Sequence, residues 1–183
     1  MPRLSTRDLA NAGLFAALTS VGALISIPAG AVPFTFQMVF VLAAGLCLGP
    51  WLGALSMCAY LLVGLVAPVY AGGASGLGTL FGPTGGYLWG FLLAAWLVGW
   101  LRRRLDSESL FLTVPMALAG LLPIYALGTL WLAAQLHMGW WAAIGAGVTP
   151  FVLFDCLKAL TAALVIRVLA TLPLGLRDSL RPR

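Results

Sequence analysis

The sequence predicts an all-α integral membrane protein, a single transmembrane domain over residues 1–183 that is built as a bundle of six helices. Three observations lead to this prediction. The chain is 62% hydrophobic and only 8% charged, whereas soluble domains carry about a quarter charged residues. Apolar runs separated by glycine and proline follow one another along the chain. Basic residues gather in alternate connections, as is typical of a chain that crosses a lipid bilayer repeatedly.

The first three apolar runs are bounded by proline and glycine, which end helices and favour turns. Pro28 to Pro33 ends the first run, and Gly49–Pro50 is expected to form a tight turn between the second and the third. The glycine-rich stretch 67–86 follows as the longest loop. The six expected spans are approximately residues 9–27, 34–48, 51–66, 87–101, 110–136 and 148–169.

The later connections are of a different kind. Residues 102–108 form a charged turn after the fourth span. Pro115 and Pro123 are expected to kink the long fifth span. A glycine- and tryptophan-rich loop, residues 137–148, then leads to the sixth.

The charges give these spans an orientation. The loops 28–33, 67–86 and 137–148 carry no Lys or Arg, whereas basic residues precede the first span, follow the fourth and follow the sixth. Basic residues near span ends stay in the cytoplasm, so we expect both termini to be cytoplasmic and the glycine-rich loops to lie outside. These basic residues form no continuous face, so no nucleic-acid partner is expected. The basic residues at or beyond the span ends are Arg3, Arg7, Arg102, Arg103, Arg104, Arg167, Arg177, Arg181 and Arg183.

An acid and a base interrupt the last apolar run. Asp155 and Lys158 lie three residues apart, so on a helix they share a face and can partly neutralise each other. A lone charge near the middle of a spanning helix costs roughly 2.5–3.5 kcal/mol on insertion scales. With Thr149 as N-cap and Pro150 as first helical residue, the pair is buried but open to the outer side. We expect it to face a polar ligand; the alternative is a purely structural ion pair between helices.

The segment that opens the second span carries a second polar candidate. Phe34, Thr35 and Gln37 belong to this segment, and Gln37 places an amide near the outer end of the span. A buried amide must find hydrogen-bond partners, so Gln37 bonds either a neighbouring helix or a ligand.

The loop between Tyr70 and Tyr87 is dense in glycine and includes Gly72 and Gly73. Glycine permits positive φ and close backbone approach, so the N–H groups of this loop can lie over a ligand while the two tyrosines supply ring faces. A flexible outer loop is the alternative interpretation.

Small residues recur at four-residue steps along the first span. Ala12 and Ala16 form one such pair, and Gly13 and Ala17 form another. Such stripes let helices pack closely in lipid. The packing partner is either another helix of this chain or a separate subunit.

No enzyme, cofactor or metal site is expected. The three cysteines lie within apolar runs without metal-ligand spacing. Gly73-Ala74-Ser75-Gly76 matches the G-x-S-G pattern of rhomboid proteases, which use a serine and a histidine. The one histidine, His137, lies beside an outer loop rather than in the sixth span, and the first outer loop has no arginine. We therefore assign no catalytic residue.

The order and spacing of four segments resemble the biotin-specific substrate-binding components, the BioY family, of energy-coupling factor (ECF) vitamin transporters. This resemblance implies outward capture of biotin in a prokaryotic plasma membrane, with a transmembrane coupling subunit and two cytosolic ATPases as partners. It also implies that Ala12 and Ala16 contact the coupling subunit. Phe154 stands where many relatives have glycine. The segments are Val32-Pro33-Phe34-Thr35-Phe36-Gln37, residues 71–78, residues 82–87, and Pro150 followed by Asp155-x-x-Lys158.

Biotin also suits the candidate residues. Its ureido ring carries two N–H donors and one carbonyl acceptor, so Asp155 can accept hydrogen bonds and Lys158 can donate one to the carbonyl or the valerate. Phe34, Tyr70 and Tyr87 are candidates for the apolar walls around the bicycle. The alternatives are a component for another small vitamin and a membrane scaffold whose ion pair only fixes helix packing. The chain has no ATP-binding motif, so ATP hydrolysis requires partner subunits.

Overall fold

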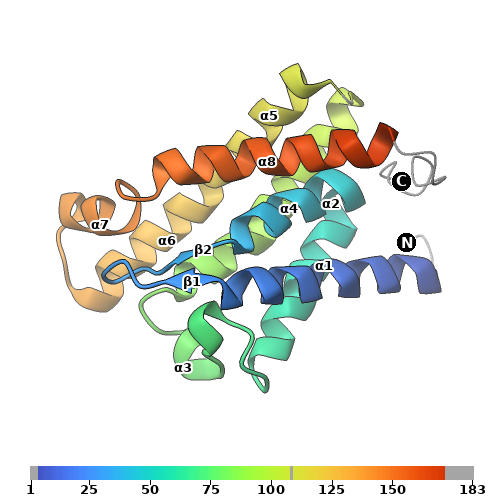
Figure 1. Cartoon of the computed structure of the whole chain (residues 1–183). Helices are drawn as coiled ribbons and strands as arrows, with labels where there is room; N and C mark the ends of the chain where they lie inside the picture. The colour runs from blue at the N-terminus through green and yellow to red at the C-terminus, as the bar shows by residue number, and fades with distance from the viewer. Residues whose placement is uncertain (1–3, 108, 172–183) are drawn as a thin grey trace.

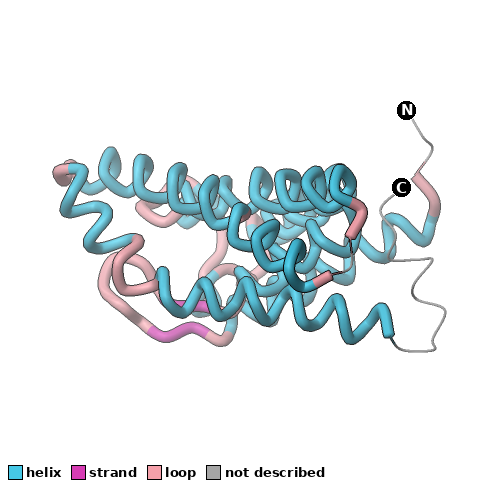
Figure 2. Tube along the Cα trace, turned by 90° about the horizontal axis from the view of Figure 1, so that it is seen from above, coloured by secondary structure: helices cyan, strands magenta, loops and turns pink. Residues whose placement is uncertain are grey.

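The structure, a computed structural model, describes residues 4–107 and 109–171, most of which are α-helical. The helices run along the long dimension of the molecule, as the view from above shows (Figure 2). A two-stranded antiparallel hairpin, β1 Ser26–Ile27 and β2 Phe34–Thr35, follows the first helix. The helices are α1 Thr6–Leu24, α2 Gln37–Gly64, α3 Leu77–Leu80, α4 Gly85–Leu105, α5 Leu110–Ala119, α6 Leu121–Leu136, α7 Trp140–Gly147 and α8 Val152–Thr171, with a 3₁₀ helix, η1 Ala71–Gly73.

The all-α class is confirmed, but the predicted count of six helices is not. Both long glycine-rich loops contain helices of their own, η1 and α3 in residues 67–86 and α7 in residues 137–148. The predicted fifth span is divided into α5 and α6 at Gly120. Pro123 explains this break, because proline lacks an N–H and its ring crowds the carbonyl four residues earlier, here that of Ala119. Pro115 lies within α5 without ending it.

A capping box starts α1 earlier than predicted. The Ser5 side chain accepts a hydrogen bond from the Asp8 backbone N–H at 3.2 Å, and Asp8 Oδ2 accepts one from the Ser5 N–H at 3.0 Å. Both bonds satisfy donors that a helix N-terminus otherwise leaves free. The helix therefore begins at Thr6 rather than near residue 9.

The small residues of α1 divide between two faces. Ala12 and Ala16 are 3% and 7% exposed and belong to the face that packs on α2. Gly13 and Ala17 are exposed on the other face. The prediction that Ala12 and Ala16 contact a separate subunit therefore needs correction, because the chain's own α2 already covers them.

The label α2 covers two arms that fold back on each other. Gly49 has φ 78° and ψ −175°, a conformation that glycine adopts without steric cost and that reverses the chain. A Cβ built on Gly53 would lie 3.2 Å from the Cα of Gly45, which places the two arms in direct contact. The predicted tight turn at Gly49–Pro50 is thus confirmed, and residues 37–48 and 51–64 are called the first and second arms below.

Helix α4 packs against this turn through glycine. A Cβ on Gly99 would lie 2.3 Å from the Gly49 carbonyl carbon and 2.4 Å from the Pro50 nitrogen. The helix then continues to Leu105, so Arg102–Arg104 form its last turn rather than the predicted charged turn. Cations at a helix C-terminus are favoured by the helix dipole, which explains the longer helix.

Gly99→Ala is expected to lower the free energy of unfolding by about 1–3 kcal/mol, because an added methyl group must push α4 away from the α2 turn. Thermal unfolding of the purified chain in detergent measures the effect. Gly13→Ala is the matched control, since nothing lies within 4 Å of its Cβ position and its helix face is exposed. An unchanged unfolding midpoint for Gly99→Ala would show that this close approach is not needed.

The two ends of the bundle differ. The first residues of α1, the connection from α4 to α5 and the last described residues of α8 lie toward one end, and the β-hairpin, α3 and α7 lie toward the other (Figure 1). Among the described residues, Gln37–Gly64 and Leu110–Leu136 are long and apolar enough to cross a membrane. Several arginines used to orient the chain lie outside the described residues: Arg3, Arg177, Arg181 and Arg183.

Candidate functional site

The start of α8 sets the position of the acid and base. Helix α8 begins at Val152, and the hydroxyl of Thr149 donates to the carbonyl of Ile144 at 3.3 Å, at the end of α7. The prediction of Thr149 as N-cap and Pro150 as first helical residue is therefore wrong. Helix α7 occupies the preceding residues, and its Ile144 carbonyl accepts the hydrogen bond of the Thr149 hydroxyl. Asp155 consequently lies in the first turn of α8, where the helix dipole favours an acidic side chain.

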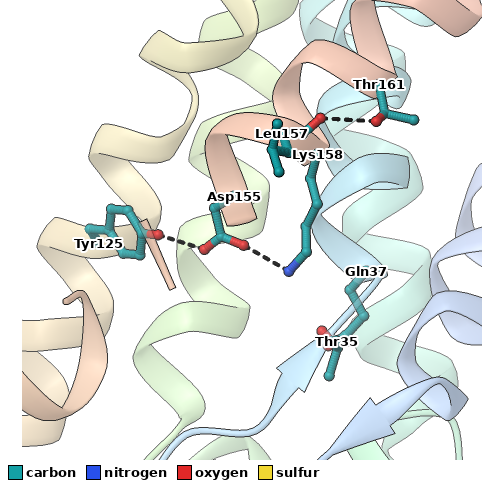
Figure 3. A network of polar contacts seen from close by, with 7 residues as sticks. All are labelled: Thr35, Gln37, Tyr125, Asp155, Leu157, Lys158 and Thr161. Atoms are coloured by element: carbon teal, nitrogen blue, oxygen red, sulfur yellow. Dashed lines mark hydrogen bonds and ion pairs between the residues drawn. The ribbon is translucent and has the colours of Figure 1, made fainter. Parts of the chain in front are cut away.

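Asp155 and Lys158 form a buried ion pair. Lys158 Nζ lies 2.7 Å from Asp155 Oδ1, and the two residues are 6% and 2% exposed (Figure 3). The hydroxyl of Tyr125, on α6, donates to the other carboxylate oxygen at 2.5 Å. A buried charge needs such compensation, because desolvation is costly without paired charges and hydrogen bonds.

Tyr125 was not predicted from the sequence. A single tyrosine in an apolar helix carries no polar pattern, and its hydrogen bond to Asp155 spans the space between α6 and α8. No pattern in the sequence signals this contact between two different helices.

An aromatic pair covers the ammonium group. Lys158 Nζ lies 3.7 Å from the ring centroid of Phe34, a distance at which a cation is attracted to a π face. The Phe34 ring in turn meets Phe154 edge to face, with centroids 5.4 Å apart and planes at 85°. Phe154 therefore supports the ring that contacts Lys158.

Gln37 finds its hydrogen-bond partners within the chain. Its Oε1 accepts from the Thr35 hydroxyl at 2.9 Å, and its Nε2 donates to the Tyr60 hydroxyl on the second arm of α2. Tyr60 donates onward to the carbonyl of Val69 at 3.2 Å. Of the two alternatives for this amide, the structure shows the neighbouring helix; the amide remains at the edge of the cavity described below.

The loop after α2 is fixed by Tyr70. Its hydroxyl donates to the carbonyl of Leu61 at 2.7 Å, and its ring meets Tyr60 edge to face at 5.6 Å. Burial raises the pKa of the Tyr70 hydroxyl above its usual value, which keeps this donor protonated. Gly72 and Gly73 have φ of 67° and 80°, so the backbone there uses the freedom expected of glycine.

These elements enclose a cavity with about 630 Å³ of empty space, part of it open to solvent. Its lining is mostly apolar with a few placed polar groups, as is usual for small-molecule sites. Gly72 and Gly73 do not line it, contrary to expectation. The predicted residues that do are Phe34, Thr35, Gln37, Tyr70, Tyr87, Asp155 and Lys158.

The remaining walls come from α2, α4 and α6 and from the loops and short helices beside them. The Tyr87 hydroxyl donates to the carbonyl of Gly147 at 3.0 Å, so its ring is held between α4 and α7. Ser75 and His137, the residues of the protease pattern, do not line the cavity. No cluster of His, Cys, Asp or Glu suited to a metal ion occurs among residues 4–107 and 109–171. The other wall residues are Val32, Pro33, Met38, Ala71, Thr79, Thr84, Leu88, Phe91, Ile124, Tyr125, Gly147 and Phe151.

This arrangement suits a small, largely apolar molecule with both donors and acceptors. Asp155 can accept hydrogen bonds and Lys158 can donate them in a site from which most water is excluded, where charge-assisted bonds are strong.

Comparisons with known proteins agree with this interpretation. The model of the BioY family matches residues 1–173. The biotin transporter BioY of Thermotoga maritima is 44% identical over 160 residues, which cover 87% of this chain and 93% of that protein. A probable biotin transporter BioY of Pyrococcus horikoshii is 42% identical over 163 residues, covering 88% and 95%.

A solved structure gives the same result. The crystal structure of the S-component for biotin from an ECF-type ABC transporter superposes with a TM-score of 0.86 at 28% identity and covers 95% of both chains. Fold, cavity and relatives together define a membrane-embedded component of a transporter and not an enzyme. The chain belongs to the BioY family.

Proposed function

We propose that this chain captures biotin at the outer face of a prokaryotic plasma membrane, as the substrate-binding subunit of an ECF-type transporter. The observation that supports this most directly is the cavity, in which apolar walls surround the buried Asp155–Lys158 pair. Relatives named as biotin transporters support the choice of ligand. Binding of radiolabelled biotin to the purified chain is the direct test.

The chemistry of the pair matches the ureido ring. Oδ1 of Asp155 accepts from Lys158 and Oδ2 from Tyr125, and each oxygen keeps a second lone pair for a ureido N–H. Lys158 has three donors and one faces Asp155, so another can reach the ureido carbonyl or the valerate. Hydrogen bonds to charged groups contribute roughly 1.5–3 kcal/mol each.

Tyr125→Phe is expected to weaken biotin binding about 3- to 10-fold, because Asp155 loses a charge-assisted donor that fixes its carboxylate. Titration of the purified variant by calorimetry measures the change. Thr161→Val is the control, since Thr161 donates only to the Leu157 carbonyl on the exposed side of α8. Equal affinity in Tyr125→Phe and wild type would show that Asp155 needs no support from α6.

We assign six membrane passes to this single domain. They are α1, the first arm of α2, the second arm of α2, α4, α5 together with α6, and α8. The end of the bundle with the β-hairpin, α3 and α7 faces outside, and the end with Arg102–Arg104 faces the cytoplasm. The cavity then opens outward, as capture of an external vitamin requires.

A cysteine at Ser75 is expected to react with a membrane-impermeant maleimide added to intact cells. Ser75 is exposed in the loop before α3, on the side assigned to the outside. The variant is made in a chain whose native Cys47, Cys58 and Cys156 are replaced by alanine. Arg103→Cys in the same background is the control and reacts only after the cells are opened. The reverse pattern would invert the proposed topology.

Transport requires partners that supply energy. The chain has no nucleotide-binding motif, so we assign ATP hydrolysis to two cytosolic ATPases and their coupling to a transmembrane subunit. The exposed Gly13 and Ala17 face of α1 can admit a close-packing helix from that subunit, since small residues permit such contact in lipid.

Two alternatives differ from this function in ways that binding can resolve. A component for another vitamin would bind biotin weakly and be displaced by its own ligand, so competition with unlabelled vitamins ranks the candidates. A membrane scaffold would bind none of them. High-affinity binding of biotin that only biotin displaces excludes both.

A further inference from the structure

Arg102, in the last turn of α4, is a buried cation that is only partly paired among the described residues. Its side chain is 5% exposed, and neither Nε nor Nη1 has a hydrogen-bond partner. Among the described residues its ion-pair partner is Asp106, whose Oδ1 lies 3.8 Å from Nη1, beyond hydrogen-bonding distance. Buried polar groups are normally hydrogen-bonded, so this guanidinium can accept a partner that the described residues do not supply.

The surroundings of Arg102 favour an anion. Gly99, one turn earlier, abuts the turn at Pro50, where the second arm of α2 begins. The first N–H groups of a helix lack partners within it and carry the positive end of its dipole. Arg102, Arg103 and Arg104 place three positive charges in the last turn of α4, and Asp106 is the ion-pair partner of Arg102 among the described residues. This carboxylate is 90% exposed and can swing aside without disturbing the core.

Tryptophans place the site at a membrane surface. Trp96 and Trp100 are half-exposed and stack with centroids 6.4 Å apart and planes at 12°. The guanidinium of Arg104 lies 5.4 Å from the Trp100 ring centroid. Indole rings gather at the level of lipid headgroups, and the cytoplasmic leaflet carries anionic lipids.

We propose that Arg102 binds the phosphate of an anionic phospholipid at the cytoplasmic end of α4. A guanidinium can give two parallel hydrogen bonds to a phosphate, which would satisfy Nε and a terminal nitrogen together. The site is separate from the cavity, because Arg102 lies 15 residues beyond Tyr87 on the same helix, roughly 22 Å at 1.5 Å per residue. The proposal uses the membrane orientation given above but does not depend on the identity of the vitamin.

Native mass spectrometry of the full chain, titrated with dioleoylphosphatidylglycerol or dioleoylphosphatidylcholine in a neutral detergent, tests this proposal. Wild type is expected to retain phosphatidylglycerol at least 5-fold more tightly than phosphatidylcholine. Arg102→Gln is expected to lose this preference. Arg103→Gln is the matched control, because it removes the same charge from the same turn but at an exposed position, and is expected to change affinity less than 2-fold.

Three results would overturn the proposal. One is unchanged phosphatidylglycerol affinity in Arg102→Gln, and another is an equal loss in Arg103→Gln, which would indicate general surface attraction. The third is binding of inorganic phosphate as tight as that of the lipid, which would make the ligand a soluble anion. Biotin binding reports whether Arg102→Gln is folded. If it is not, Arg102→Lys takes its place: the proposal predicts at least 3-fold weaker binding of phosphatidylglycerol, and unchanged binding would contradict it.

Discussion

Asp155→Asn and Lys158→Met are each expected to lower the affinity for biotin at least ~10-fold, about 1.4 kcal/mol. Asn keeps the volume of Asp155 but loses the charge that holds Lys158 at 2.7 Å. Each single variant also leaves its partner charge buried and unpaired, which costs more than the net contribution of the pair. Calorimetric titration and thermal unfolding of the purified proteins measure both effects.

The double variant separates a binding role from a structural one. Without an orphan charge it is expected to unfold at a higher temperature than either single variant, yet it should still bind biotin poorly, because the charge-assisted contacts are gone. Thr161→Val again serves as control on the same helix. Recovery of near-native affinity in the double variant would mean that the pair only fixes the packing of α8.

Ala16→Trp is expected to abolish biotin binding, whereas Ala17→Trp should leave it nearly intact and abolish uptake. Ala16 is buried against α2, where an indole cannot fit without moving the helix, and overpacking typically costs about 1–3 kcal/mol and sometimes more. Ala17 is exposed, so an indole there affects only a helix that comes from outside the chain.

The two adjacent alanines are controls for each other. Biotin binding to the purified variants and uptake of labelled biotin in cells that express the energising subunits are measured together. If Ala17→Trp transports normally, this face of α1 does not contact the coupling subunit. If Ala16→Trp binds biotin normally, α1 does not need to pack closely on α2.

Local chemistry predicted much of the fold. Gly49–Pro50 was predictable as a turn because one residue permits positive φ and the other cannot continue a helix. The β-hairpin was missed, since strands of two residues, such as Ser26–Ile27, are too short for an alternating pattern. The helices within the outer loops were missed as well, because glycine-rich sequence favours turns and only tertiary contacts select a helix there.

Residues of the candidate site were predictable where their polarity differed from that of the surrounding segment. Asp155 and Lys158 are charges within an apolar run. Such charges are costly in a membrane span unless they have a specific role, so the sequence alone identified them as candidates. Tyr125 does not differ in character from its helix, and its role is apparent only from its hydrogen bond to Asp155 on a different helix. Thr149 shows the opposite error, because a sound local rule for helix starts was overridden by the neighbouring α7.

The turn at Gly49 also affects the order in which the chain can assemble. The arms of α2 meet through residues close in sequence, such as Gly45 and Gly53, so closing them requires little loop entropy. Helices α1, α4 and α8 all pack on α2. Contacts of short sequence separation form fastest, so a hairpin complete by Gly64 offers a preformed surface to the later helices as they leave the ribosome. A substitution of Gly49 that disfavours its positive φ would then delay assembly of the whole chain, not only of this turn.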